Sequence, residues 1–211
     1  MTPKLVTEFI GTFFWVFIAA LSGVYAGPFA PAAVGLAVTA LVYMGSHVSG
    51  GHYNPAVTLA VFLRGKLPPG AAIAYIVVQV AGAAVGAVTA RGITGQLLQV
   101  TPGDHVISTA ALTIEALFTF ILALVVLNTT TAKQTQNNSY FGAAIGCTVL
   151  VAILAGGKVS GGAFNPAAAL GPALVGVLTG TASTSLWWIY LVGPCIGAAA
   201  AALVFRVQKQ E

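Results

Sequence analysis

Charged residues are scarce in this sequence. Of its 211 residues, 8 are Lys or Arg and 4 are Asp or Glu, so charged side chains make up 6% of the chain. A typical soluble domain has about 25%, and a chain with so few cannot cover its surface with hydrated side chains. The basic residues are scattered singly and form no basic patch, despite a net charge of +4. We therefore expect neither a soluble fold nor a nucleic-acid partner.

Residues suited to catalysis or metal binding are equally few. The two cysteines, Cys147 and Cys195, both lie in apolar stretches, where we interpret them as small hydrophobic residues. We find no pairing of a nucleophile with a base and no cluster of metal-ligating residues. The sequence thus predicts no enzyme, no metal site and no cofactor.

Long apolar runs take the place of charge. A transmembrane helix needs about 20 apolar residues, and backbone groups in lipid must find their partners within the helix. Strands of a membrane barrel would instead alternate over about 10 residues. We predict an all-α membrane protein with six transmembrane helices, over Leu5–Tyr25, Pro31–Val48, Gly70–Ala90, Ser108–Asn128, Ser139–Gly156 and Ser185–Val207. The first run has no obvious cleavage site after it, so we expect it to be retained.

One polar motif occurs twice in this apolar chain. Ser-Gly-Gly-x-x-Asn-Pro-Ala begins at Ser49 and again at Ser160, an offset of 111 positions (160 − 49). Each copy leads into an apolar stretch that is too short to cross a membrane, Asn54–Arg64 and Asn165–Val175. Asn is a good N-cap, and Pro fits the first helical position. We predict two re-entrant half helices, each entered through an extended Ser-Gly-Gly segment.

The duplication extends beyond the motif. Glu8 in the first span and Glu115 in the fourth have similar surroundings, so residues 1–105 and 106–211 are interpreted as two repeats of one membrane domain. Each repeat has three spans and a half helix. Because three is odd, the second repeat enters the membrane from the opposite side, which makes an inverted repeat. The N-termini of the two half helices are then expected to meet near the midplane of the membrane.

The positions of Lys and Arg predict the orientation. Cytoplasmic loops of membrane proteins carry an excess of these residues. An internal N-terminus places six of them in the cytoplasm (Lys4, Arg64, Lys66, Lys133, Arg206 and Lys209) and only Arg91 and Lys158 outside. We therefore expect a multi-pass protein of the plasma or inner membrane with both termini cytoplasmic.

The predicted junction of the half helices suits uncharged molecules. Two helix N-termini, each with about half a positive charge, repel cations and protons. Each capping Asn uses its carbonyl on its own helix and keeps its amide as a donor. Backbone carbonyls are expected to line the path as acceptors, at Gly50, Gly51, His52, Gly161, Gly162 and Ala163. Glu8 and Glu115 are interpreted as acceptors for backbone N–H groups of the Ser-Gly-Gly segments, with a proton relay as the alternative.

These features resemble the aquaporin (major intrinsic protein) family over nearly the whole chain. The resemblance is carried by the motifs Asn54-Pro55-Ala56 and Asn165-Pro166-Ala167, by one Glu in each half and by Gly171-Pro172-Ala173. It implies a homotetramer in the lipid bilayer, with one pore per subunit that passes water or small neutral solutes. The helix-dipole barrier described above is the general explanation of proton exclusion in this family.

The chain departs from the family at the outer constriction. Members usually have Arg directly after the second motif, and this position is Ala168. Spacing from the motifs assigns the other constriction positions to Val34, Ile153 and Gly162. The resemblance therefore implies a wide apolar filter, and the solutes considered are glycerol, urea, ammonia and hydrogen peroxide. The alternatives are a leaky or gated pore with reduced proton and cation exclusion, or a poorly conducting protein with a structural role.

Several interpretations stay open at this point. His52 is either a gate at the inner vestibule or a partner of neighbouring backbone. His105 and Lys158 are candidates to replace the missing Arg, or are solvated loop residues. A secondary transporter also has inverted repeats, but it needs ion-coupling groups near the half-helix starts, and neither Glu8 nor Glu115 is adjacent to one in sequence.

Overall fold

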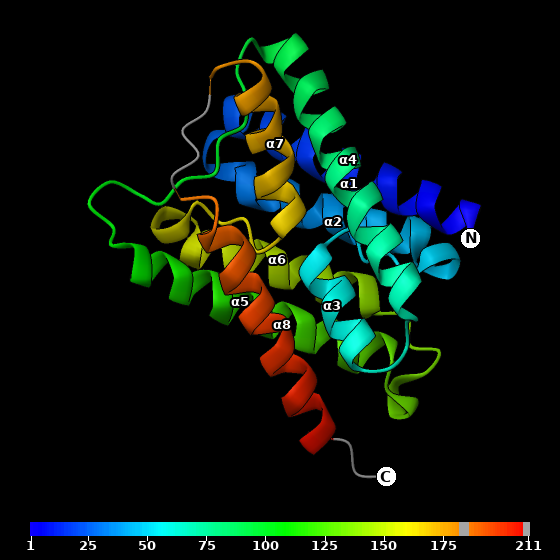
Figure 1. Cartoon of the computed structure of the whole chain (residues 1–211). Coiled ribbons are helices and arrows are strands. Elements are labelled where there is room, and N and C mark those ends of the chain that lie inside the picture. Colours follow the sequence, from blue (N-terminus) through cyan, green and yellow to red (C-terminus); the bar gives the residue numbers. More distant parts are fainter. Residues whose placement is uncertain (182–185, 209–211) are drawn as a thin grey trace.

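The computed structural model describes residues 1–181 and 186–208, and in these ranges the regular structure is entirely helical. Figure 1 shows the arrangement, with two shorter helices, α3 in cyan and α7 in yellow and orange, in the middle of the view. The α-helices are α1 (Thr2–Tyr25), α2 (Ala30–Ser49), α3 (Pro55–Leu63), α4 (Pro69–Thr94), α5 (Ser108–Thr130), α6 (Phe141–Ser160), α7 (Pro166–Leu178) and α8 (Ile189–Gln208). Six of them are long and apolar enough to cross a membrane: α1, α2 with the turn before it, α4, α5, α6 and α8.

The six predicted spans are confirmed, with some changes at their ends. Helix α6 continues to Ser160, four residues beyond the predicted end at Gly156, and α7 ends at Leu178 instead of Val175. Helix α8 begins at Ile189. The predicted start of that span, Ser185, and the basic residue Lys209 lie outside the described residues.

Helix α3 follows its predicted bounds closely. Asn54 is its N-cap in an extended conformation, Pro55 occupies the first helical position, and Arg64 is the C-cap. Helix α7 begins in the same way, with Asn165 as N-cap and Pro166 after it. The missing N–H of proline costs nothing at this position, because the first N–H groups of a helix have no partner within the helix.

Long helices pair in the same way within each half of the chain. Helix α1 packs along α4, and α5 packs along α8. Gly82 of α4 lies so close to the carbonyl of Phe9 that a Cβ atom could not fit, and Gly197 of α8 lies equally close to the carbonyl of Ala116. Glycine is required at such positions because the two helix backbones touch. The two halves thus build their main helix pairs by the same close approach.

The half helices join the two halves together. Helix α3 packs mainly on α8, and α7 packs mainly on α4, so each half helix lies chiefly against a long helix of the other half. Helices α2 and α6 complete the contact between halves. The outside of the molecule carries many exposed large apolar side chains, for example Leu36, Ile73 and Leu117. Such a surface fits a lipid environment and would be costly in water.

Candidate functional site: the junction of the two half helices

Each half helix begins at a buried asparagine that caps it. The Asn54 Oδ1 atom accepts from the backbone N–H of Ala56 at 2.8 Å, and the Asn165 Oδ1 atom accepts from Ala167 at 3.0 Å. Both asparagines are fully buried. The caps satisfy one backbone donor at each helix start and direct the remaining N–H groups toward the space between the two helices.

The two asparagines also bind each other's segments. The Asn54 Nδ2 atom donates to the carbonyl of Phe164 at 2.9 Å, and the Asn165 Nδ2 atom donates to the carbonyl of Tyr53 at 3.0 Å. These reciprocal bonds bring the two N-termini together. The amide of each Asn was expected to remain as a donor for the path, but one bond from each amide is made within the protein. An amide group has two hydrogens, so one donor per asparagine remains for a permeating molecule.

Glu8 of α1 holds the segment before α3. Its carboxylate accepts from the Ser49 hydroxyl (2.6 Å), the backbone N–H of His52 (3.0 Å), the backbone N–H of Tyr53 (2.7 Å) and the Gln79 side-chain amide (2.8 Å). The side chain is fully buried. All four partners donate, so the carboxylate acts purely as an acceptor.

Glu115 of α5 does the same for the segment before α7. Its carboxylate accepts from the Ser160 hydroxyl at 2.7 Å and from the backbone N–H groups of Ala163 at 3.1 Å and Phe164 at 2.7 Å. It is also fully buried. A buried carboxylate is costly unless such bonds surround it. This geometry makes each Glu an anchor for the non-helical backbone.

Tyr53 and Phe164 are held from both sides. They have positive φ angles of 48° and 46°, which are uncommon for residues with a side chain. The N–H group of each is bound by a glutamate and the carbonyl of each by an asparagine. The surrounding hydrogen bonds thus impose a backbone conformation that these residues would rarely adopt alone.

The Ser-Gly-Gly segments are not extended, so this part of the sequence prediction is wrong. Gly50 and Gly51 have φ angles of 96° and 63°, and Gly161 and Gly162 have φ angles of 90° and 72°. All four are left-handed, a region that glycine enters without a steric penalty. Gly50 and Gly161 form left-handed C-caps of α2 and α6. The chain therefore turns sharply out of each helix before the glutamate captures the next N–H groups.

The carbonyls expected to line the path remain free of protein donors. None of these groups accepts a hydrogen bond from a described residue, whereas the neighbouring carbonyls of Tyr53 and Phe164 do. The set consists of Gly50, Gly51, His52, Gly161, Gly162 and Ala163. Unpaired carbonyls within a membrane protein need a water or solute partner, which supports a role as acceptors.

The four predicted filter residues lie in two places: Val34, Ile153 and Gly162 lie near the crossing of α2 and α6, and Ala168 lies at the start of α7. Helices α2 and α6 cross where Gly35 meets Leu150, and Val34 and Ile153 lie beside this crossing. A Cβ atom built on Gly162 would lie 3.8 Å from Cγ1 of Ile153, so these two are neighbours.

Ala168 lies in the first turn of α7 and is 6% exposed. It belongs to a different apolar cluster, with Ala83 and Ala87 of α4 and with Leu97 and Leu98 of the following loop. Ala168 therefore packs with apolar side chains on this side. The structure brings Ile153 and Gly162 together, whereas Ala168 belongs to another apolar cluster.

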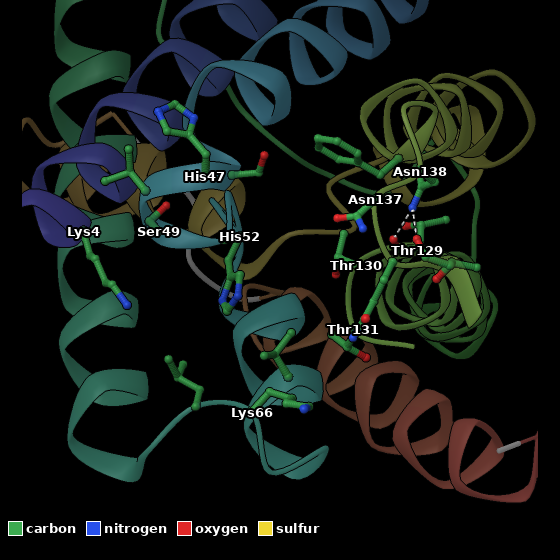
Figure 2. Close-up of a pocket in the computed structure, with 18 of the residues that line it drawn as sticks. Lys4, His47, Ser49, His52, Lys66, Thr129, Thr130, Thr131, Asn137 and Asn138 are labelled. Carbon is green, nitrogen blue, oxygen red and sulfur yellow. Dashed lines mark hydrogen bonds between the residues drawn. The ribbon is translucent and has the colours of Figure 1, made fainter. Parts of the chain in front are cut away.

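A cavity of about 660 Å³ opens at the end of the molecule where α1 begins. Its basic lining residues are Lys4, His47, His52 and Lys66. The opposite side is formed by the end of α5 (Thr129 and Thr130) and by the α5–α6 connection, including Thr131 and Asn137 (Figure 2). In Figure 2 the ring of His52 points into this space from the segment before α3, between the two lysines and the threonines. We call this cavity the vestibule; Ser49, Gly50 and His52, which line it, belong to the segment that leads into α3.

The remaining candidates lie away from the junction. His105 is exposed, with a positive φ of 62°, in the α4–α5 loop. Lys158 lies near the end of α6, and its carbonyl is in close contact with Gly103 of the same loop. Arg91 binds the Thr179 hydroxyl at 2.8 Å, at the far end of α7.

Sequence reasoning missed several residues of this site. Tyr75 donates to the carbonyl of Ser49 at 2.8 Å, and Tyr190 donates to the carbonyl of Ser160 at 2.6 Å. Gln79 was missed as well. The sequence does contain signals for them. The two tyrosines occupy matching positions in the two repeats, and Gln79 is a polar residue in an otherwise apolar stretch.

Comparison with known proteins agrees with this architecture. The model of the family described as major intrinsic protein matches residues 1–205. The glycerol uptake facilitator protein-like 6 of Lactiplantibacillus plantarum is 36% identical, with 99% of each chain covered. Aquaporin NIP1-4 of Oryza sativa is 38% identical over 96% of this chain and 76% of its own length.

A solved structure shows the same fold. The aquaglyceroporin of Plasmodium falciparum superposes with a TM-score of 0.86 at 23% identity, covering 97% of this chain and 95% of its own. This likeness shows the fold. The family match and the relatives named above support a passive channel for water and small solutes and not an enzyme. This chain belongs to the major intrinsic protein family.

Proposed function

We propose that the protein is a broad channel for neutral solutes, with an apolar outer filter formed by Val34, Ile153, Gly162 and Ala168. The observation that supports this most is Ala168, a buried alanine at the position where the resemblance predicts Arg. Ala168 packs with apolar residues, including Leu97 and Leu98. Such a filter offers no side-chain donor, so it selects by size and not by hydrogen bonding.

The predicted solutes follow from this filter. Water passes, and so do glycerol, urea, ammonia and hydrogen peroxide, because no charged side chain narrows the path at this point. One relative with 36% identity is named as a glycerol uptake facilitator, which supports glycerol. Other relatives are named aquaporins, which supports water. Polar permeants find acceptors in the free carbonyls and donors in Asn54 and Asn165 further along the path.

Charge exclusion then depends on the junction alone. The N-termini of α3 and α7 face each other through their capping asparagines. Each end contributes about half a positive charge, and this field opposes cations and protons. The Arg that would add a second barrier is absent. The proposal therefore predicts weaker cation exclusion than in members that have both barriers.

We also propose an assembly and an orientation. Residues 1–105 and 106–211 form the two repeats, and four copies associate in the plasma or inner membrane, as the family resemblance implies. The vestibule with Lys4 and Lys66 lies on the cytoplasmic side, because loops rich in basic residues stay there. Both termini are then cytoplasmic.

The test is osmotic flux into proteoliposomes for wild type, Ala168→Arg and Ala168→Leu. The Leu variant is the matched control, since it adds volume without charge or donors. We expect wild type to pass water and glycerol, the Arg variant to lose glycerol and keep water, and the Leu variant to lose both to a similar degree. If the ratio of water permeability to glycerol permeability is the same in wild type and in Ala168→Arg, the proposed filter is refuted.

A further inference from the structure

The first half of the chain contains a buried polar network that the second half lacks. The Gln79 Nε2 atom donates to Glu8 Oε2 at 2.8 Å and to the hydroxyl of Thr58 at 2.9 Å. The same hydroxyl lies 3.1 Å from Nδ1 of His52. Glu8, Gln79 and Thr58 are fully buried, and His52 lines the vestibule. The network thus runs from a carboxylate to the wall of the proposed path.

Each hydrogen in this network has a defined direction. A carboxylate accepts, so the atom of Gln79 that faces Glu8 is the NH2 nitrogen. The second hydrogen of that NH2 group goes to Thr58, whose oxygen then acts as an acceptor. The hydroxyl hydrogen of Thr58 remains, and the neighbouring acceptor is Nδ1 of His52. Nδ1 must therefore be unprotonated to receive it.

The opposite arrangement is less favourable. If Nδ1 of His52 carried a proton and donated, the hydroxyl of Thr58 would accept twice, and its own hydrogen would have no acceptor among the described residues. A buried donor without a partner is costly. The ring of His52 is also oriented by an edge contact with Tyr75, at 5.3 Å between centroids. The network thus selects one tautomer and one ring position.

The second half shows that the fold does not need this network. Counting from the paired asparagines Asn54 and Asn165, the positions that match His52 and Thr58 are Ala163 and Ala169. Counting from the paired tyrosines Tyr75 and Tyr190, the position that matches Gln79 is Pro194. Glu115 nevertheless anchors its own segment.

Anchoring the segment is therefore a separate task from orienting the histidine. The buried Oε1 atom of Gln79 has no hydrogen-bond partner among the described residues. A buried oxygen without a partner is unfavourable for stability. The two hydrogens of the Gln79 Nε2 atom therefore indicate a role for this residue beyond stabilising the fold.

We propose that Glu8, Gln79 and Thr58 are positioning residues that hold His52 as a neutral imidazole with its proton on Nε2, so that a fixed hydrogen-bond donor faces the vestibule. The ligand class is an uncharged molecule with an oxygen acceptor, such as water or a polyol. His52 thereby orients the oxygen of each entering molecule toward the ring. The free carbonyls nearby then receive the hydrogens of the same molecule.

The direct test is solid-state NMR of protein in liposomes with histidine labelled by 15N and 13C. The chain has three histidines, so the difference from a His52→Gln spectrum assigns the signal. In wild type we expect the proton-bearing nitrogen to correlate with Cδ2, which marks Nε2. A proton on Nδ1, or on both nitrogens, would overturn the proposal.

Variants separate positioning from folding. Thr58→Val removes the hydroxyl and is expected to give a mixture of tautomers, whereas Thr58→Ser restores the single one. Thr119→Val is the matched control, since Thr119 is an equally buried threonine in the other half, and it should leave the His52 signal unchanged. An unmixed tautomer in Thr58→Val would contradict the network.

The transport consequence rests on the proposed function and is measured separately. Glycerol flux through Thr58→Val should fall about two- to fivefold, because the variant loses an effect no larger than that of one neutral hydrogen bond. Thr58→Ser should restore the flux. Unchanged flux with mixed tautomers would refute the orienting role. Absence of flux in wild type would refute the proposed function while the NMR result still tests the tautomer.

Discussion

Glu115→Gln gives the sharpest prediction for stability. The carboxylate accepts three hydrogen bonds, and the substitution replaces one oxygen by an NH2 group that donates. The least costly orientation keeps Ser160 and Ala163 on the remaining oxygen. The buried N–H of Phe164 then faces another donor and loses its 2.7 Å bond.

The magnitude follows from these bonds. Loss of one bond to a charged acceptor, with a buried N–H left unpaired, costs about 2–4 kcal/mol. Weakening of the two remaining bonds, which lose their charged acceptor, brings the total to about 3–5 kcal/mol. With a soluble-domain conversion of about 2–4 °C per kcal/mol, the apparent melting temperature should fall by roughly 10 °C.

The assay is thermal unfolding of the purified protein in detergent, followed by intrinsic tryptophan fluorescence at one fixed scan rate. Ser160→Ala is the internal comparison, because it removes one donor and leaves the carboxylate, and its expected cost is about 1–2 kcal/mol. A shift for Glu115→Gln within 2 °C of wild type, or smaller than the shift for Ser160→Ala, would refute the anchoring role.

Three further predictions concern packing and the junction. Gly82→Ala should destabilise the protein by about 1–3 kcal/mol through a clash with α1. Gly92→Ala on the same helix has open space around it and should be neutral or stabilising by up to about 1 kcal/mol. Equal melting temperatures for these two variants would contradict this prediction. Asn165→Ala should cost about 2 kcal/mol, because it loses a cap and a bond to the other half, and Asn165→Asp should recover the part due to the cap in the same melting assay. Tyr75→Phe and Tyr190→Phe should each cost about 1 kcal/mol by loss of one hydrogen bond, and a large difference between them would contradict the symmetry of the two anchors.

The spans and half helices could be predicted because their signals are local. Apolar length defines a span, and an Asn-Pro pair at the end of a polar segment defines a helix start. For this reason the prediction for α3 is accurate to a residue at each end.

Helix ends were harder to predict where a residue has a role in tertiary packing. Gly156 looked like the end of α6, but a Cβ atom there would clash with Ile114 and Phe118. This glycine allows a close approach between helices and does not terminate one. The predicted second half helix already ran through Pro172, and α7 does continue there, with Gly171 packed against Ala83.

The details of the site could not be predicted because distant residues determine them. The Ser-Gly-Gly segments were expected to be extended, yet Glu8 and Glu115 bind the N–H groups that follow, and the glycines turn left-handed instead. The network of Gln79, Thr58 and His52 needs three segments to converge, and no spacing within one segment signals it.

The most direct test of the account is the response of wild-type proteoliposomes to a glycerol gradient, recorded by stopped-flow light scattering beside empty liposomes. A channel with the filter proposed around Ala168 predicts rapid shrinkage as water leaves, followed by reswelling as glycerol enters well above the rate of empty liposomes. Shrinkage without accelerated reswelling would contradict the broad filter, and a trace that matches empty liposomes in both phases would contradict an open pathway between the two half helices.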